Sequence, residues 1–335
     1  MLRAFIGFDH IGKNLAEASW LPYCGYALTK YSTGKQLLIT TDGWLSSAAG
    51  VSSGVPTESI LDLSSYMVPG NNGISVGMRI KNITAGNTGN MLFVGTTTAG
   101  TDAQVVASFS HLPAGGETYM EATYNFATNL FTVFTDGVQI GQAAISTVNV
   151  ANLKAGKLVL FLVHGSTGTS GLTNYRDIVV TDDIAGDGIV TRLGDRIVYP
   201  VTIDSATGTD WTASGGGSLL ATLNVPIETV GAATITSGAS KSPLITGLKP
   251  GAIPAGANID GVALVTAGRT DVATALVGVN LSYNSKTVAA PSKVFGATLK
   301  YNNPVGVFAR APDGSRWTSS SIDATTLSLT PDVAS

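Results

Sequence analysis

Residues 119–140 read YMEATYNFATNLFTVFTDGVQI, and this stretch decides the fold. It contains short strand-forming segments joined by tight turns. Asp136-Gly137 is the sharpest turn signal in the chain, because both central positions of a type I′ turn require positive φ and an Asp-Gly pair tolerates it. The stretch therefore predicts a β-hairpin closed by a two-residue turn.

The turn also sets the register of the predicted hairpin. Side chains in a strand repeat every two residues, so the hairpin has one wet face and one dry face, as in a β-sandwich. We expect the dry face to consist of Phe131, Val133, Val138 and Ile140. The predicted cross-strand pairs are Thr135 with Val138, Val133 with Ile140, and Phe131 with Gln142.

The composition favours an all-β protein with few charges. Hydrophobic residues make up 44% of the 335 residues, and 40 residues are Gly. Abundant Gly, Thr and Val favour many short strands and tight turns over helices. Charged residues make up only 12%, which is about half the usual share. So few charges indicate a surface covered by partners, as in a homo-oligomer; the alternative is a monomer with a neutral, hydroxyl-rich surface.

Three further segments carry strand patterns before residue 195. Ile74–Lys81 alternates apolar and polar residues, which is typical of a half-buried strand. Lys157–His164 is almost continuously apolar and predicts a strand buried on both faces. Tyr175–Thr181 is another strand, and no stretch before residue 195 keeps a helical period over three turns. We therefore predict a sandwich of two packed antiparallel sheets.

The character of the sequence changes after Gly194-Asp195. We predict residues 1–195 as a jelly-roll β-sandwich and residues 196–335 as a smaller C-terminal β region for packing or oligomerisation. The candidate strands of this second region are Ile197–Ile203, Ile259–Thr266, Ala273–Tyr283, Ser292–Tyr301 and Val305–Ala309, with short helices as the alternative for the second and third.

Charge and hydropathy exclude two classes of partner. The net charge is −3 and Lys and Arg do not cluster, so we expect no binding of nucleic acid. The longest apolar run, Leu158–Val163, is far shorter than the roughly 20 residues of a membrane helix, so we expect no membrane insertion. The start MLRAFIGFDH has a short, interrupted apolar run and does not resemble a signal peptide. These features predict a soluble protein made in the cytosol.

The residue types that usually carry catalysis are scarce. His10, His111 and His164 have unrelated spacings, and Cys24 is the only cysteine. These spacings predict no metal site, and a lone cysteine allows no intrachain disulfide. The chain has neither a Gly-x-Ser-x-Gly elbow nor a phosphate-binding loop. We predict no catalytic residue, no cofactor and no metal.

Glycoside hydrolysis is the main enzymatic alternative, because it needs two carboxylates about 5 to 9.5 Å apart. Glu117 and Glu121 share one face of a predicted strand, but four residues of strand separate them by about 13 Å. Asp182 and Asp183 are adjacent and point to opposite faces of a strand. The simpler interpretation of both pairs is a solvated strand end.

Two binding sites remain as alternatives. Asp182, Asp183 and Asp187, around Gly186 and Gly188, form a possible calcium loop, but their spacing does not match an EF-hand and acidic loops are common at strand ends. Four tryptophans offer possible stacking platforms for sugar rings, although buried packing is the expected fate of each. They are Trp20, Trp44, Trp211 and Trp317.

The opening stretch resembles a known family. Tyr119–Tyr124, a turn, and then Phe131–Val138 give an aromatic residue, a strand with a Glu, a second strand and Asp-Gly. This order is similar to the concanavalin A-like (laminin-G-type) jelly roll, in which 74–81 resembles the preceding strand and 175–183 the closing strand. Two residues depart from the pattern: Tyr119 stands where Trp is common, and Arg176 stands where an acidic residue is common.

The order of later motifs resembles tailed-bacteriophage virion structural proteins. The motifs are Leu193-Gly194-Asp195-Arg196-Ile197 after the jelly roll, then Asp210-Trp211-Thr212, Val262–Arg269 and Trp317-Thr318.

This resemblance implies a non-enzymatic structural component of a virion, in the tail, the neck or the capsid surface. Such a protein self-assembles, contacts other virion proteins and is localised in the virion after assembly in the host cytoplasm. The alternative function is a carbohydrate-binding adhesion module that recognises host surface glycans. A glycosidase is the third and weakest hypothesis.

Overall fold

The computed structural model divides the chain into two compact units. Unit 1 consists of Met1–Leu21 and Tyr26–Val198, and unit 2 of Pro22–Gly25 and Tyr199–Ser335. The residues that the structure describes are 1–8, 15–16, 27–30, 37–47, 57–82, 90–95, 104–109, 116–165, 173–184, 192, 194–224, 234–238, 242–268, 275–295 and 300–333.

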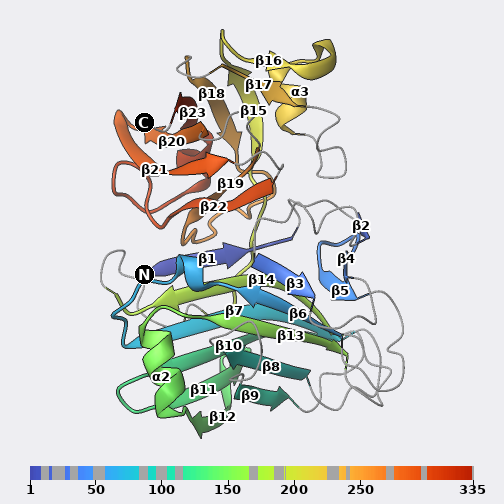
Figure 1. The fold of residues 1–335 in the computed structure, drawn as a ribbon, viewed down its shortest axis with the longest axis vertical. Coiled ribbons are helices and arrows are strands. Elements are labelled where there is room, and N and C mark those ends of the chain that lie inside the picture. Colours follow the sequence, from blue (N-terminus) through green and yellow to red (C-terminus); the bar gives the residue numbers. More distant parts are fainter. Residues whose placement is uncertain are drawn as a thin grey trace. The chain divides into compact units, whose positions relative to one another are not determined.

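Unit 1 contains a nine-stranded antiparallel sheet (Figure 1). Its path runs β12-β11-β10-β7-β14-β5-β4-β2, and β1 also pairs with β14. The strands are β1 (Leu2–Ile6), β2 (Leu15–Ala16), β4 (Leu37–Ile39), β5 (Leu45–Ser47), β7 (Gly73–Asn82), β10 (Glu117–Asn125), β11 (Leu130–Thr135), β12 (Val138–Ala144) and β14 (Thr173–Asp182).

A five-stranded antiparallel sheet packs against it, with the order β3-β6-β13-β8-β9. These strands are β3 (Ala27–Lys30), β6 (Thr57–Asp62), β8 (Asn90–Gly95), β9 (Gln104–Phe109) and β13 (Val159–Gly165). The alternating apolar residues Ile74, Val76, Met78 and Ile80 of β7 are all buried, as the sequence pattern predicts. Val159–Leu162 of β13 is buried on both faces, which confirms the prediction for the continuous apolar run.

The hairpin turn is confirmed, but its register and its buried face are partly wrong. Asp136 and Gly137 both have positive φ, at 46° and 84°, and Thr135 pairs with Val138. One extra residue then enters β12 and forms a β-bulge. Val133 pairs with Gly141 instead of Ile140, and Phe131 pairs with Ala143 instead of Gln142.

Of the predicted dry face, only the residues of β11 are therefore buried. Phe131 and Val133 are buried, whereas Val138 is 67% exposed and Ile140 is 50% exposed. The physical reason is the position of β12, which is the last strand of the nine-stranded sheet and has a neighbour on one side only among the described residues.

The described residues of unit 1 also form two short helices, η2 (Ser64–Tyr66) and α2 (Thr147–Lys154). The sequence interpretation did not assign α2, because eight residues are too few for three turns of helical periodicity. Its start carries a capping signal, since the Ser146 side chain accepts a hydrogen bond from the Asn149 backbone N–H.

Unit 2 is a smaller assembly of sheets. A five-stranded sheet has the order β15-β18-β23-β20-β21, and two two-stranded sheets pair β16 with β17 and β19 with β22. Trp317 lies in its buried core and donates its indole N–H to the Phe308 carbonyl at 2.7 Å. The strands are β15 (Thr202–Thr207), β16 (Thr212–Ala213), β17 (Ile235–Thr236), β18 (Leu244–Lys249), β19 (Val262–Gly268), β20 (Ala275–Tyr283), β21 (Lys286–Phe295), β22 (Lys300–Phe308) and β23 (Thr326–Val333). The helices are η3 (Ser214–Gly216), α3 (Leu219–Leu223) and α4 (Ser319–Asp323).

Two strand predictions in unit 2 need correction. The extended run predicted from Ile197 becomes a strand only at Thr202, and within it the Val198 backbone N–H bonds to the Asp177 side chain of unit 1. The strand predicted for Ser292–Tyr301 belongs to two elements, since β21 ends at Phe295 and β22 begins at Lys300.

The predicted fold class is confirmed: the protein is all-β, with a two-sheet antiparallel sandwich followed by a smaller C-terminal β region. Within the described part of the chain, no helix is long and apolar enough to cross a membrane.

Candidate functional site: the outer face of the nine-stranded sheet

The side chains of β7 and β10 that point away from the core include two cations and two carboxylates. Arg79 and Lys81 alternate with the buried residues of β7, and Glu117, Tyr119 and Glu121 do the same in β10. The two strands pair so that Glu117 lies opposite Lys81 and Tyr119 lies opposite Arg79. We call this side of the nine-stranded sheet, away from the five-stranded sheet, the outer face.

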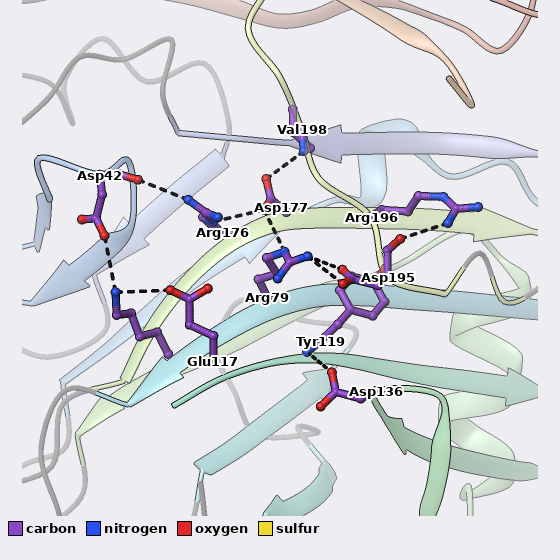
Figure 2. A network of polar contacts seen from close by, with 11 residues as sticks. Asp42, Arg79, Glu117, Tyr119, Asp136, Arg176, Asp177, Asp195, Arg196 and Val198 are labelled. Carbon is purple, nitrogen blue, oxygen red and sulfur yellow. Dashed lines mark hydrogen bonds and ion pairs between the residues drawn. The ribbon is translucent and has the colours of Figure 1, made fainter. Parts of the chain in front are cut away.

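A bulge in β14 adds Asp177 to this face. The pairing of β14 with β7 shifts between Arg176 and Val179, and Asp177 has a φ of 52°. The Asp177 carboxylate is buried, with Arg176 Nε at 3.2 Å and Arg79 Nε at 3.6 Å from its Oδ2. Its Oδ1 accepts a hydrogen bond from the Val198 backbone N–H at 2.9 Å (Figure 2). One buried carboxylate thus gathers two arginines and a backbone donor.

Residues 192 and 194–198 lie across the outer face, and we call them the strap. Arg79 Nη2 donates hydrogen bonds to both oxygens of the Asp195 carboxylate, at 2.6 and 2.7 Å, and the charges on both partners strengthen them. The side chain of Val198 packs against Gly7, where an added Cβ would lie 3.0 Å from Val198 Cγ1. Figure 2 shows Asp195 and Val198 approaching the sheet above Arg79 and Asp177.

Glu121 anchors the first residue of the strap. Its Oε2 accepts a hydrogen bond from Arg192 Nε at 3.1 Å, and its Oε1 accepts one from Ser75 Oγ at 3.0 Å. The Arg192 guanidinium lies 3.6 Å from the centroid of the Phe134 ring and also donates to the Gly137 carbonyl. The expectation that Glu121 is solvated is wrong, because Arg192 compensates its charge and lets it be buried.

Tyr119 lies flat in the middle of the outer face. Its ring covers Gly77, where an added Cβ would lie 1.9 Å from the Tyr119 hydroxyl oxygen. Burial, and then the negative charge of Glu121, hold the pKa of the Tyr119 phenol well above its usual value. The backbone N–H of Tyr119 donates to Asp136 Oδ1 at 2.9 Å, which ties the hairpin turn to β10 (Figure 2).

A second group of charges surrounds Trp44. The Arg176 guanidinium and the Lys81 ammonium lie 4.5 and 5.5 Å from the centroid of the Trp44 ring, as cation–π contacts. Lys81 Nζ also lies 3.3 Å from Glu117 Oε1 and 3.5 Å from Asp42 Oδ2. Partial burial raises the pKa of Asp42, but the hydrogen bond from Thr40 Oγ1 and the nearby Lys81 outweigh it and leave that pKa below its usual value.

The acidic residues proposed for calcium have other partners. Asp182 is buried, and its Oδ2 accepts a hydrogen bond from Arg3 Nε at 2.5 Å, so the expectation of a solvated strand end is wrong for it. Asp183 Oδ1 accepts the Asn72 backbone N–H at 2.7 Å, and Asp187 lies outside the described residues. Within the described part of the chain, no group of three His, Cys, Asp or Glu is placed to hold a metal.

Several other singled-out residues also fall outside the description. His10, His111, Cys24 and Trp20 lie outside the described residues, and the side chain of His164 is not among those described. Trp44 and Trp317 are buried, as predicted. Trp211 is partly exposed and donates its indole N–H to the Ser242 carbonyl at 2.9 Å.

Taken together, the charged side chains of the outer face pair with one another. The carboxylates Asp42, Glu117, Glu121, Asp177 and Asp195 each lie within ion-pair distance of Lys81, Arg79, Arg176 or Arg192. Sequence reasoning missed this network because Arg192 and Glu121 are 71 residues apart. The sequence does show charged residues at the outward positions of β7 and β10. That pattern does not identify the network, because a sheet that simply faces solvent has the same pattern.

Comparison with known proteins gives a likeness of fold. No protein family and no curated protein matches the chain. Lectin II from Ulex europaeus matches with a TM-score of 0.35 and 10% identity, over 55% of this chain and 100% of that chain. The Lotus tetragonolobus seed lectin matches with a TM-score of 0.34 and 9% identity, over 53% of this chain and 98% of that chain. A family 7 alginate lyase matches with a TM-score of 0.29 and 12% identity, over 45% of this chain and 84% of that chain. At these identities and TM-scores no residue role passes to this chain.

Proposed function

We propose that this chain is a non-enzymatic structural component of a bacteriophage virion that self-assembles and contacts other virion proteins. Its place is the tail, the neck or the capsid surface. The observation that carries this proposal is the outer-face network, in which charged side chains fasten the strap to the sheet instead of facing a substrate. The link to virions comes from the order of motifs along the sequence.

The pairing of the carboxylates supports a scaffold rather than an enzyme. Glu121 is held by Arg192 and Ser75, and Glu117 lies beside Lys81. A glycosidase needs one carboxyl group to donate a proton and another to act as nucleophile or base across the sugar. Contacts that lock each carboxylate to a cation of the same chain suit rigidity better than proton transfer.

The surface supports assembly. Large apolar side chains remain exposed at several described positions of a chain with only 12% charged residues. Apolar exposure with little charge favours contacts with other proteins. The exposed side chains are Val68, Val138, Ile140, Ile197, Ile245 and Val288.

The glycan-binding alternative has less support. A sugar-stacking platform needs an exposed aromatic face, but Trp44 and Trp317 are buried in this structure. Trp211 is the one described tryptophan with substantial exposure.

The test is to purify virus particles assembled in cells that carry the native gene for this chain. Quantitative mass spectrometry would give its copy number, and gold-labelled antibody in electron microscopy would give its position. We expect many copies at one fixed position of the particle. Absence from purified particles would overturn the proposal, and a specific signal on a glycan array would move the function to adhesion.

A further inference from the structure

We propose that β12 is an assembly edge, at which β12 of one copy pairs with β12 of a second copy and joins two nine-stranded sheets. This inference rests on the proposed function, because it names the surface through which self-assembly would occur. Sequence interpretation assigned oligomerisation to residues 196–335, so this edge is a different surface.

The topology leaves one side of β12 open. It is the last strand of its sheet, and among the described strands it pairs only with β11. Six of its seven residues are exposed, with Val138 at 67% and Ile140 at 50%. An open strand edge presents backbone N–H and C=O groups that form hydrogen bonds readily with another strand.

Four of the other outer strands of the three larger sheets carry the features that proteins use to protect such edges: short length, charge or proline. In unit 1, β2 has two residues, and β3 has four residues and ends at Lys30. In unit 2, β15 carries Asp204, and β21 carries Lys286, Pro291 and Lys293.

The β12 end of the sandwich lacks these three features. β12 has the sequence VQIGQAA, with neither a charged residue nor a proline in seven positions. β9, the outer strand of the five-stranded sheet, reads QVVASF and is also free of charge and proline. β9 contacts β11, and Figure 1 shows β9 and β12 at the same end of unit 1. Among the described strands, both sheets therefore lack these protecting features at one end of the sandwich.

A second copy is the partner that this strand suits best. In a two-fold pairing each strand meets its own sequence in the opposite direction, so a charge near the middle of the strand is brought close to the same charge of the other copy. β12 has no charge and avoids that repulsion. Val138 and Ile140 supply apolar contact, and Gln139 and Gln142 offer amides for hydrogen bonds across the pair.

The expected dimer is weak. Seven residues of strand extend about 24 Å, and the bulge between Gln139 and Gly141 interrupts the regular part of the strand. An edge of this size buries less than the roughly 800 Å² per partner of a stable complex. We therefore expect association in the micromolar range, which becomes effective when many copies are held in one particle.

The experiment uses the full chain and compares Ile140→Lys and Ile140→Glu with the control Val68→Lys, which changes an exposed apolar residue outside β12. Sedimentation velocity over a range of concentrations measures association, and circular dichroism checks the fold of each variant. We expect dimers for the wild type and for Val68→Lys, and a dissociation constant at least about tenfold higher for each Ile140 variant alone. A mixture of the Lys and Glu variants should associate again, because a homotypic edge places the opposite charges side by side.

The outcomes separate this inference from the proposed function. An oligomer that both Ile140 variants leave unchanged overturns the β12 edge and leaves the virion role standing. Loss of association in the variants without recovery in the mixture also overturns homotypic pairing, because β12 would then meet a different surface. A wild-type chain that stays monomeric at all concentrations overturns the edge, whereas absence from purified particles overturns the virion role.

Discussion

At the scale of single residues, the absence of a side chain at Gly77 lets the Tyr119 ring pack against the outer face. The Tyr119 ring lies over Gly77, and an added Cβ would come within 1.9 Å of the hydroxyl oxygen and 2.7 Å of Cζ. Since the ring is buried, a methyl group at position 77 forces it out of place. This glycine is therefore part of the site, although it has no side chain.

We predict that Gly77→Ala lowers the free energy of unfolding by about 1–3 kcal/mol, because it overpacks a buried contact. Gly278→Ala is the matched control, since an added Cβ there meets no atom closer than 3.8 Å. The control should leave stability unchanged or raise it slightly, as a strand glycine gains from a less flexible unfolded state. Urea unfolding of both variants measures the difference, and equal effects of the two substitutions would contradict the prediction.

Two buried tyrosines give the protein a pH dependence in alkali. Burial raises the pKa of Tyr124, and burial followed by the charge of Glu121 raises that of Tyr119. Because both folded-state pKa values lie above the unfolded value of about 10, their contribution to stability is complete below pH 10. It is lost as the pH rises from there through the folded-state pKa values.

We predict that Tyr124→Phe weakens this alkaline loss by up to about 1.4 kcal/mol per pH unit above pH 10. At neutral pH the same change should be neutral or stabilising by up to about 1 kcal/mol, since the buried Tyr124 hydroxyl has no hydrogen-bond partner among the described residues. Urea midpoints measured from pH 8 to 11 test both statements. An unchanged alkaline slope would show that Tyr124 ionises as freely in the folded state as in the unfolded state.

At the scale of elements, the strap is held by two ion pairs of different burial. Arg192 meets a Glu121 side chain that is 4% exposed, whereas Arg79 meets an Asp195 side chain that is 53% exposed. Solvent screens the second pair, and exposed pairs contribute at most about 1 kcal/mol. Removal of Arg192 would leave the Glu121 carboxylate buried with a weaker set of partners.

We predict a larger coupling energy for the buried pair in double-mutant cycles. One cycle uses Arg192→Met and Glu121→Gln, and the matched cycle uses Arg79→Met and Asp195→Asn. We expect about 1–3 kcal/mol for the first and less than about 1 kcal/mol for the second. Chemical denaturation at low and high salt measures both, and salt should weaken the second coupling more than the first. Equal couplings would mean that solvent reaches Glu121.

The same elements show how far the sequence predicts this fold. The regular alternation of β7 and the apolar run of β13 were predicted because each pattern depends on burial along a single strand. The β12 bulge was not predicted, since the alternating apolar pattern of the sequence does not show which residue is inserted. The partners of Glu121 escaped prediction for another reason: residue spacing in one strand says nothing about a segment 71 residues away.

At the scale of the whole molecule, the strap belongs to unit 1 and leads into unit 2. The boundary between the units falls after Val198, whereas the sequence pattern placed it after residue 195. The difference matters physically, because Val198 donates its backbone N–H to the buried Asp177 carboxylate and packs against Gly7. A domain that ends at residue 195 would lack both contacts.

We predict that a fragment of residues 1–198 unfolds cooperatively and that a fragment of residues 1–191 is less stable by about 2 kcal/mol or more. The shorter fragment loses the Arg192, Asp195 and Val198 contacts and leaves the buried Glu121 and Asp177 carboxylates with fewer donors. A fragment of residues 1–203 is the control, because it adds chain beyond the strap and should match 1–198. Urea unfolding followed by circular dichroism gives the three free energies. Equal stability of 1–191 and 1–198 would show that the strap lies on a sheet that is stable without it, and the charged outer face would then be free to contact another protein.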